Sequence, residues 1–302
     1  MKTKGRKYWS DLRWFLLFSL PGVIYIIFFV AYPIFYNVIM SFQDVTASTL
    51  LKTDKEFVGL LNYTTIFSNP KIVGSIVNTL IFTVASIGFQ FVIGFLLALL
   101  FSNKFPLNKL YRALVMIGWM VPMLVVATIG KWFFTGDASS LVNYFLMKLG
   151  FIEEPIMWLV NTNTAMFAMI CVNIWKGIPF NMLLMTTALT TMPEDIYEAA
   201  AIDGATRIQR FFRITVPLLK PTILAVITQG FILTFKAFEL IYVMTKGGPA
   251  DTTHIMATYS YSLTFDQFQF SQGAAIANVM FAILLVFSLF YVKLISKDEV
   301  IG

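Results

Sequence analysis

Residues 74–101 read GSIVNTLIFTVASIGFQFVIGFLLALLF and contain no acidic or basic residue. A helix of ~20 apolar residues is long enough to cross the hydrocarbon core of a bilayer. Similar runs occur elsewhere in the chain, and several contain Gly or Pro, which membrane helices tolerate. The chain therefore predicts six membrane-spanning helices, near residues 14–40, 74–101, 114–134, 165–188, 222–244 and 274–295.

The composition of the whole chain leads to the same class. Of its 302 residues, 58% are hydrophobic and only 13% are charged, whereas soluble domains carry roughly 25% charged residues. A single soluble core of this size could not bury so much apolar surface, and a transmembrane barrel would show short alternating segments. The composition indicates an all-α membrane protein and excludes a soluble globular protein, a disordered chain and a disulfide scaffold.

The positive charges indicate how the helices are oriented. If the N-terminus is cytoplasmic, most of the 22 Lys and Arg residues, including every arginine, fall in cytoplasmic segments. Loops on the cytoplasmic side of membrane proteins carry such an excess. We therefore expect both termini in the cytoplasm. The net charge of +6 reflects this topology, and no nucleic-acid partner is expected.

The loop at 189–220 between the fourth and fifth spans has its own helical signals. Pro193 can begin a helix, because its missing N–H costs nothing at the first position. Asp203-Gly204 reads as a stop, since Gly readily adopts the left-handed conformation. Arg207, Arg210 and Arg213 follow at intervals of three and share roughly one helix face. These features predict two short helices joined by a glycine turn, which is either a plain cytosolic connector or a docking segment.

This loop carries a recognisable signature. The stretches EAAAIDGA (198–205) and ITVP (214–217) resemble the EAA motif of permease subunits of bacterial ABC importers, with Val216 at a position where Leu is usual. The resemblance implies that the segment is a coupling helix, at 193–213, that docks in a groove on the ATPase subunit. The implied coupling residues are Glu198, Ala199, Ala200, Asp203, Gly204, Arg207 and Arg210.

Further segments resemble the carbohydrate branch of that family, in particular the maltose-permease-like first subunit. They are GLLNY (59–63), NT (78–79), WKGIPF (175–180), TKGGP (245–249) and GAA (273–275). The resemblance runs from about residue 14 to 295 and implies the type I ABC importer permease fold. It implies one permease domain over 1–302, with an N-terminal segment and first helix at 1–42 and core helices at 74–295.

The resemblance also implies partners and a location. Such a subunit pairs with a second permease, two ATPase subunits and an extracytoplasmic solute-binding protein. It would be a multi-pass protein of the bacterial inner (plasma) membrane, in contact with membrane lipid. Its substrate would be a sugar or oligosaccharide.

The chain lacks the motifs of an ATPase. A phosphate-binding loop requires G-x-x-x-x-G-K-[ST], and the one Gly-Lys candidate, Gly130-Lys131, is followed by Trp132. We therefore expect no enzymatic activity and no cofactor or metal in this chain, with ATP and magnesium on the partner ATPases. The only histidine, His254, is expected to be a loop residue.

Three ionisable residues fall within predicted spans: Lys176, Lys236 and Glu239. Each costs roughly 2.5–3.5 kcal/mol to insert, so such residues mark a pair, a cavity or a pathway. One interpretation is an ion pair between Glu239 and either lysine. The other is that Lys176 lines a translocation cavity and binds solute hydroxyls or an anionic group.

A sugar pathway needs polar groups for hydroxyls and aromatic faces for the ring, and the fourth and fifth spans offer both. The resemblance to the maltose-type pocket implies the positions Lys176, Gly177, Phe180, Gly230, Leu233, Thr234 and Ala237. The predicted pathway residues are Asn173, Trp175, Lys176, Gly177, Phe180, Gln229, Gly230, Leu233, Thr234, Ala237 and Glu239.

The sequence thus predicts a permease subunit of an ATP-driven sugar importer, and three alternatives stay open. The solute could be a non-sugar such as a polyol phosphate. The chain could be a membrane-embedded enzyme acting on lipid-linked sugars, which would need a catalytic carboxylate facing a cavity. It could also be a passive channel or receptor core, which would leave the EAA segment unexplained.

Overall fold

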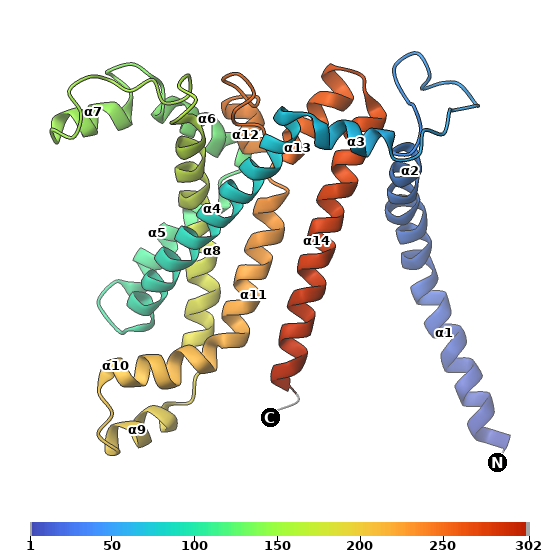
Figure 1. Cartoon of the computed structure of the whole chain (residues 1–302). Coiled ribbons are helices and arrows are strands. Elements are labelled where there is room, and N and C mark those ends of the chain that lie inside the picture. Colours follow the sequence, from blue (N-terminus) through green and yellow to red (C-terminus); the bar gives the residue numbers. More distant parts are fainter. Residues whose placement is uncertain (1, 300–302) are drawn as a thin grey trace. The chain divides into compact units, whose positions relative to one another are not determined.

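The computed structural model describes residues 2–299 (Figure 1), which are mostly helical. Within that range the extended pairing is limited to two isolated β-bridges. The chain divides into two compact units. One comprises Met1–Ser68 with Ser260–Val279, and the other comprises Asn69–Tyr259 with Met280–Gly302. Each unit is described by itself.

The first unit begins with a long apolar helix. Helix α1 (Lys2–Ile26), a π-helical turn (Ile27–Ala31) and α2 (Tyr32–Met40) follow one another without a break. The span Trp14–Met40, predicted with these bounds, has no buried residue in its most apolar window. A helix that is apolar all round and exposed suits a lipid environment.

Polar side chains hold the rest of the first unit together. The Tyr63 hydroxyl on α3 (Leu61–Ser68) lies 2.8 Å from Ser41 Oγ and accepts from Asn278 Nδ2 at 3.2 Å. The Asn62 amide donates to the Ser41 carbonyl at 2.9 Å. Asn37 Nδ2 donates to Asn278 Oδ1 at 2.7 Å, within α14 (Phe270–Glu299). The GLLNY segment therefore packs against the beginning of the last helix.

Helices α4 (Pro70–Ser102) and α8 (Ala165–Thr190) form the most extensive helix pair of the second unit. A Cβ placed on Gly94 would lie 2.6 Å from Asn181 Cβ and 3.0 Å from the Met182 backbone nitrogen. A Cβ on Gly177 would lie 2.2 Å from the Gln90 side chain. Small residues let membrane helices approach closely, so these glycines set the α4–α8 separation.

The third predicted span is a bent pair of helices. Helix α5 (Asn108–Met120) and α6 (Met123–Phe133) meet at 94°, where the sequence predicted one run over 114–134. The break falls at Val121 and Pro122. Proline pushes the residue before it out of the helical region, and Val121 has φ −64° and ψ 130°. Counted as one span, the pair gives up to six membrane-crossing helices.

The fifth predicted span, over 222–244, ends earlier than expected. Helix α9 (Glu194–Ile202), α10 (Arg207–Arg210) and a π-helical turn (Phe211–Thr215) lead into α11 (Val216–Phe235). Lys236 ends α11 with φ −97° and ψ 15°, and Glu239 begins a separate helix, α12 (Glu239–Met244). The predicted span over 222–244, which contained both Lys236 and Glu239, is therefore wrong as one continuous helix.

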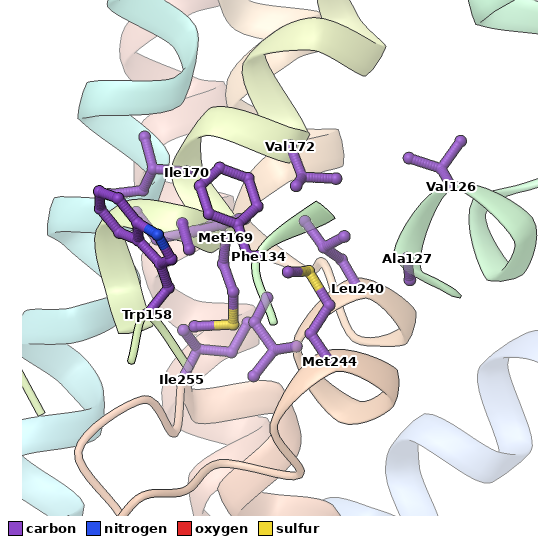
Figure 2. Packing of buried hydrophobic residues seen from close by; sticks show 13 residues of the cluster. Val126, Ala127, Phe134, Trp158, Met169, Ile170, Val172, Leu240, Met244 and Ile255 are labelled. Carbon is purple, nitrogen blue, oxygen red and sulfur yellow. The ribbon is translucent and has the colours of Figure 1, made fainter. Parts of the chain in front are cut away.

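A buried apolar cluster fixes α12 against α6 and α8 (Figure 2). Leu240 and Met244 on α12 belong to the same cluster as Met169 on α8. At its edge the rings of Phe134 and Trp158 meet edge to face, with centroids 5.7 Å apart and an interplanar angle of 81°. Dispersion contacts of this kind, summed over many atoms, favour one position for α12.

A buried asparagine orders the segment around α7 (Leu141–Lys148). Asn143 Oδ1 accepts from Trp158 Nε1 at 2.7 Å and from the Ile156 amide at 3.2 Å. Its Nδ2 donates to the carbonyls of Asp137 and Ile156. One side chain thus connects the segments on both sides of α7.

The NT segment contacts the loop that follows the TKGGP segment, near the beginning of α4. Asn78 Nδ2 donates to the carbonyls of Thr252 and His254 at 2.8 and 3.0 Å. Thr79 Oγ1 accepts from the Met256 amide at the start of α13 (Met256–Tyr261). His254 lies between helices as predicted, but it is buried, with Nδ1 3.1 Å from Thr258 Oγ1.

Candidate functional site

A cavity of about 410 Å³ opens among α4, α5, α8, α11 and α12. A volume in this range suits a small ligand. The cavity brings together most of the pathway residues that the sequence predicts, from helices far apart along the chain. The predicted residues that line it are Asn173, Lys176, Gly177, Phe180, Gly230, Leu233, Thr234, Ala237 and Glu239.

Two predicted pathway residues, Trp175 and Gln229, are not among its lining residues. The Trp175 side chain is 52% exposed, and its ring lies beside Gly118 of α5. Gln229 is also exposed, next to Gly230 on α11. Successive residues of a helix point about 100° apart, so a neighbour of a lining residue readily faces elsewhere.

The ammonium group of Lys176 is bound to the end of α5. Its Nζ donates to the carbonyls of Trp119 and Val121, each at 2.6 Å, and lies 3.4 Å from that of Gly118. These carbonyls lack helical partners because the helix breaks here, and the C-terminal end of a helix attracts cations.

Among the described residues, neither Lys176 nor Lys236 forms a salt bridge with Glu239. The predicted ion pair is therefore wrong.

An aromatic pair lies beside this lysine. The rings of Trp119 on α5 and Phe180 on α8 stack with centroids 5.5 Å apart and an interplanar angle of 16°. Both residues line the cavity. Phe180 was predicted from the sequence and Trp119 was not, although the nearby Pro122 marks the end of α5.

Two buried amides give another part of the wall a polar character. Gln90 Nε2 donates to the Asn173 carbonyl at 2.8 Å, and both side chains line the cavity. The Asn173 Nδ2 is buried without a hydrogen-bond partner in the described part of the chain. Such an orphaned donor costs about 1–3 kcal/mol, which an acceptor on a bound molecule would offset. Gln90 and Asn181, also in the lining, were missed because the residues around them in the sequence are mostly apolar.

The second candidate site is the segment that joins α8 to α11, which lies at one end of both helices (Figure 1). Helix α9 ends in a Schellman turn: the amides of Gly204 and Ala205 donate to the carbonyls of Ala201 and Ala200. Gly204 has φ +75°. Thr206 and Gln209 then form a reciprocal capping box that begins α10. The predicted pair of helices with a glycine turn is observed, except that Pro193 precedes α9 as its cap.

Exposed side chains dominate this segment. Ile202 is 87% exposed and Ile208 is 72% exposed. The predicted coupling residues Glu198, Ala199, Asp203, Gly204 and Arg207 are exposed, while Ala200 and Arg210 are half-buried. Tyr197 holds α9 to the following π-helical turn, its hydroxyl 2.9 Å from Thr215 Oγ1. The segment is thus internally ordered, yet presents an apolar and charged surface.

Near the beginning of α4, Lys71 and Asp251 form an ion pair at 2.6 Å. Burial raises the pKa of the Tyr259 hydroxyl, and the Asp251 carboxylate raises it further.

In the described residues, no three His, Cys, Asp or Glu side chains are grouped to hold a metal ion.

Comparison with known proteins identifies the class. Residues 90–298 match the family described as "Binding-protein-dependent transport system inner membrane component". Because this match spans more than half of the chain, the chain belongs to that family of membrane permeases. The predicted membership of the ABC importer permeases is confirmed.

Relatives match over nearly the whole chain. The sulfoquinovosyl glycerol transport system permease protein of Agrobacterium fabrum is 35% identical over 295 residues, covering 96% of this chain and 94% of the relative. The trehalose/maltose transport system permease protein of Thermococcus litoralis is 31% identical, covering 92% of each chain.

Two solved structures share the fold. One is a bacterial ABC transporter involved in import of the acidic polysaccharide alginate, with a TM-score of 0.81, 23% identity and coverage of 96% of this chain and 99% of that chain. The other is a bacterial alginate ABC transporter in complex with a periplasmic protein bound to alginate pentasaccharide. It has a TM-score of 0.79 and 25% identity, and the match covers 94% of this chain and 95% of that chain. The predicted all-α permease fold is confirmed.

Proposed function

We propose that this permease carries a sugar or oligosaccharide across the bacterial inner membrane, driven by ATP hydrolysis on partner subunits. The observation that carries the proposal is the cavity among α4, α5, α8, α11 and α12. It combines an aromatic pair, Trp119 and Phe180, with the Asn173 amide, whose Nδ2 has no hydrogen-bond partner in the part of the chain that the structure describes. Aromatic faces suit a sugar ring, and amides suit its hydroxyl groups.

The α9–α10 segment supports ATP-driven action. We propose that Glu198, Gly204 and Arg207, with their neighbours, dock on an ATPase subunit that binds ATP and magnesium. ATP binding would then favour an outward-open state over an inward-open state, both of which already exist in the free protein. The relatives named as transport systems support this arrangement. A second permease and an extracytoplasmic solute-binding protein complete the proposed complex.

The proposal includes the orientation of the chain in the membrane. Lys and Arg are in excess in the segments that six spans would place on the same side of the membrane as the N-terminus. This excess favours a cytoplasmic location for both termini and for the α9–α10 segment. The 1–302 chain acts in this proposal as one permease domain.

The alternatives have less support. An enzyme acting on lipid-linked sugars needs acid–base groups, and Glu239 is the only carboxylate among the cavity's lining residues. A passive channel would have no use for the exposed α9–α10 surface. A polyol phosphate remains a competing solute, because Lys176 and Lys236 line the cavity.

The test is ATP-driven uptake by the complete complex in proteoliposomes, using a panel of neutral oligosaccharides, acidic oligosaccharides and polyol phosphates presented with the cognate binding protein. We expect ATP-dependent uptake of a saccharide. Uptake of a polyol phosphate alone, or uptake that does not need ATP, would contradict the proposal.

A further inference from the structure

The cavity wall carries an imbalance of charge. Lys176 and Lys236 line it together with one carboxylate, Glu239. In the part of the chain that the structure describes, neither lysine forms a salt bridge with that carboxylate. A charge inside a membrane protein is costly unless it is paired or serves a pathway. The excess positive charge is therefore available to an anionic ligand.

The ammonium of Lys176 is held in place without being neutralised. Two hydrogen bonds of 2.6 Å to the carbonyls of Trp119 and Val121 fix its position. The third contact, to the Gly118 carbonyl, is 3.4 Å long, beyond the usual range of about 2.7–3.2 Å. An ammonium group has three donors, so one N–H is only weakly engaged. The carbonyls supply dipoles and no net charge.

Groups suited to a saccharide lie on the same face of α8. Asn173 precedes Lys176 by three residues and Phe180 follows it by four, so all three side chains are helical neighbours. Each lines the cavity. The buried Asn173 amide, which has no partner among the described residues, and the Phe180 ring stacked on Trp119 thus flank the anchored ammonium.

We infer that the solute is an acidic saccharide, whose carboxylate accepts the weakly engaged N–H of Lys176 while a ring hydroxyl accepts from Asn173. This inference rests on the proposed function and names its substrate class. Phosphate shares the anionic chemistry, but a polyol phosphate has no sugar ring for the aromatic pair. The carbonyls of α5 act as a positioning device, because they hold the ammonium in the cavity before the solute arrives.

The experiment measures binding to the purified complete complex in lipid nanodiscs, without the solute-binding protein, so that the permease alone sets the preference. The ligands are a labelled oligouronide, its neutral oligosaccharide counterpart and glycerol phosphate. We expect the oligouronide to bind at least about tenfold more tightly than its neutral counterpart, the size of one charge-assisted hydrogen bond. Lys176→Met should abolish this preference, and Lys176→Arg should retain most of it.

Lys131→Met is the matched control. It removes the same charge from an exposed position on α6 that does not line the cavity, and it should keep the preference. If Lys176→Met weakened the binding of both saccharides equally, Lys176 would only stabilise the end of α5, and the inference would be overturned. Equal wild-type affinity for the two saccharides would also overturn it, while leaving the proposed function intact. Binding of glycerol phosphate alone would overturn both.

Discussion

The α9–α10 segment and the cavity wall differ in how far along the chain their stabilising contacts reach. The turn at Gly204 is closed by hydrogen bonds between residues a few positions apart. The cavity instead depends on contacts between distant helices, such as Lys176 with Trp119 and Gln90 with Asn173. A change in the local turn should leave the bundle intact, whereas a change in how these distant helices pack also changes the cavity.

The largest expected effect is at the local turn. Gly204→Val places a β-branched side chain at φ +75°, where a non-glycine residue costs about 1–2 kcal/mol. A Cβ at this position meets nothing within 4 Å, so the bundle should fold normally. We expect uptake by the proteoliposome complex to fall to background, because the docking surface changes shape, while the thermal unfolding temperature of the permease stays close to that of the wild type.

Gly150→Val provides a matched control for this prediction. Gly150 follows α7 with φ +73°, would have nothing within 4 Å of an added Cβ, and forms the same Schellman hydrogen bonds with its neighbours. The conformational free energy that Gly150→Val costs should therefore equal that of Gly204→Val. Uptake should persist in this variant. Equal loss of uptake in both variants would indicate general destabilisation and remove the special role of Gly204.

A smaller effect is expected where the helices pack. Gly94→Ala brings a methyl group within 2.6 Å of Asn181 Cβ and 3.0 Å of a backbone nitrogen on α8. Such overpacking costs about 1–3 kcal/mol, because backbone atoms cannot move aside as a flexible side chain does. We expect a lower thermal unfolding temperature in detergent and reduced, not abolished, uptake.

Gly88→Ala is the corresponding control on the same helix. A Cβ there meets nothing within 4 Å, and alanine is the better helix former. Its unfolding temperature should match or exceed that of the wild type. If Gly94→Ala were as stable as Gly88→Ala, the close α4–α8 contact would not set the cavity's geometry.

The same contrast explains what could be predicted from the sequence. The α9–α10 helices were predicted because Pro193 and Gly204 act locally. Most cavity residues on α8 and α11 were also predicted, partly through the resemblance to the maltose-type pocket. Gln90 and Trp119 were missed because only the packing of α4 and α5 against α8 brings them to the cavity.

The wrong helix bounds and the wrong ion pair have one physical origin. An apolar run specifies that a segment can be buried in a bilayer, but it does not specify where its backbone bends. The 94° bend between α5 and α6 and the break at Lys236 both interrupt runs that read as continuous spans. The first break leaves free the backbone carbonyls that accept from Lys176. The second places Glu239 on a different helix from the one that ends at Lys236. The predicted ion pair failed for that reason.

If the α9–α10 segment couples ATP binding to the cavity, as we propose, ATP should change the access to the cavity from the outer face. This coupling is tested most directly by labelling Leu233→Cys, a half-exposed cavity position, in a Cys171→Ser background. The complete complex in proteoliposomes is exposed to a membrane-impermeant thiol reagent from the outer face, with and without ATP. We expect faster labelling with ATP, and loss of that ATP effect when Gly204→Val is added. Labelling at one rate under all of these conditions would contradict the proposed coupling.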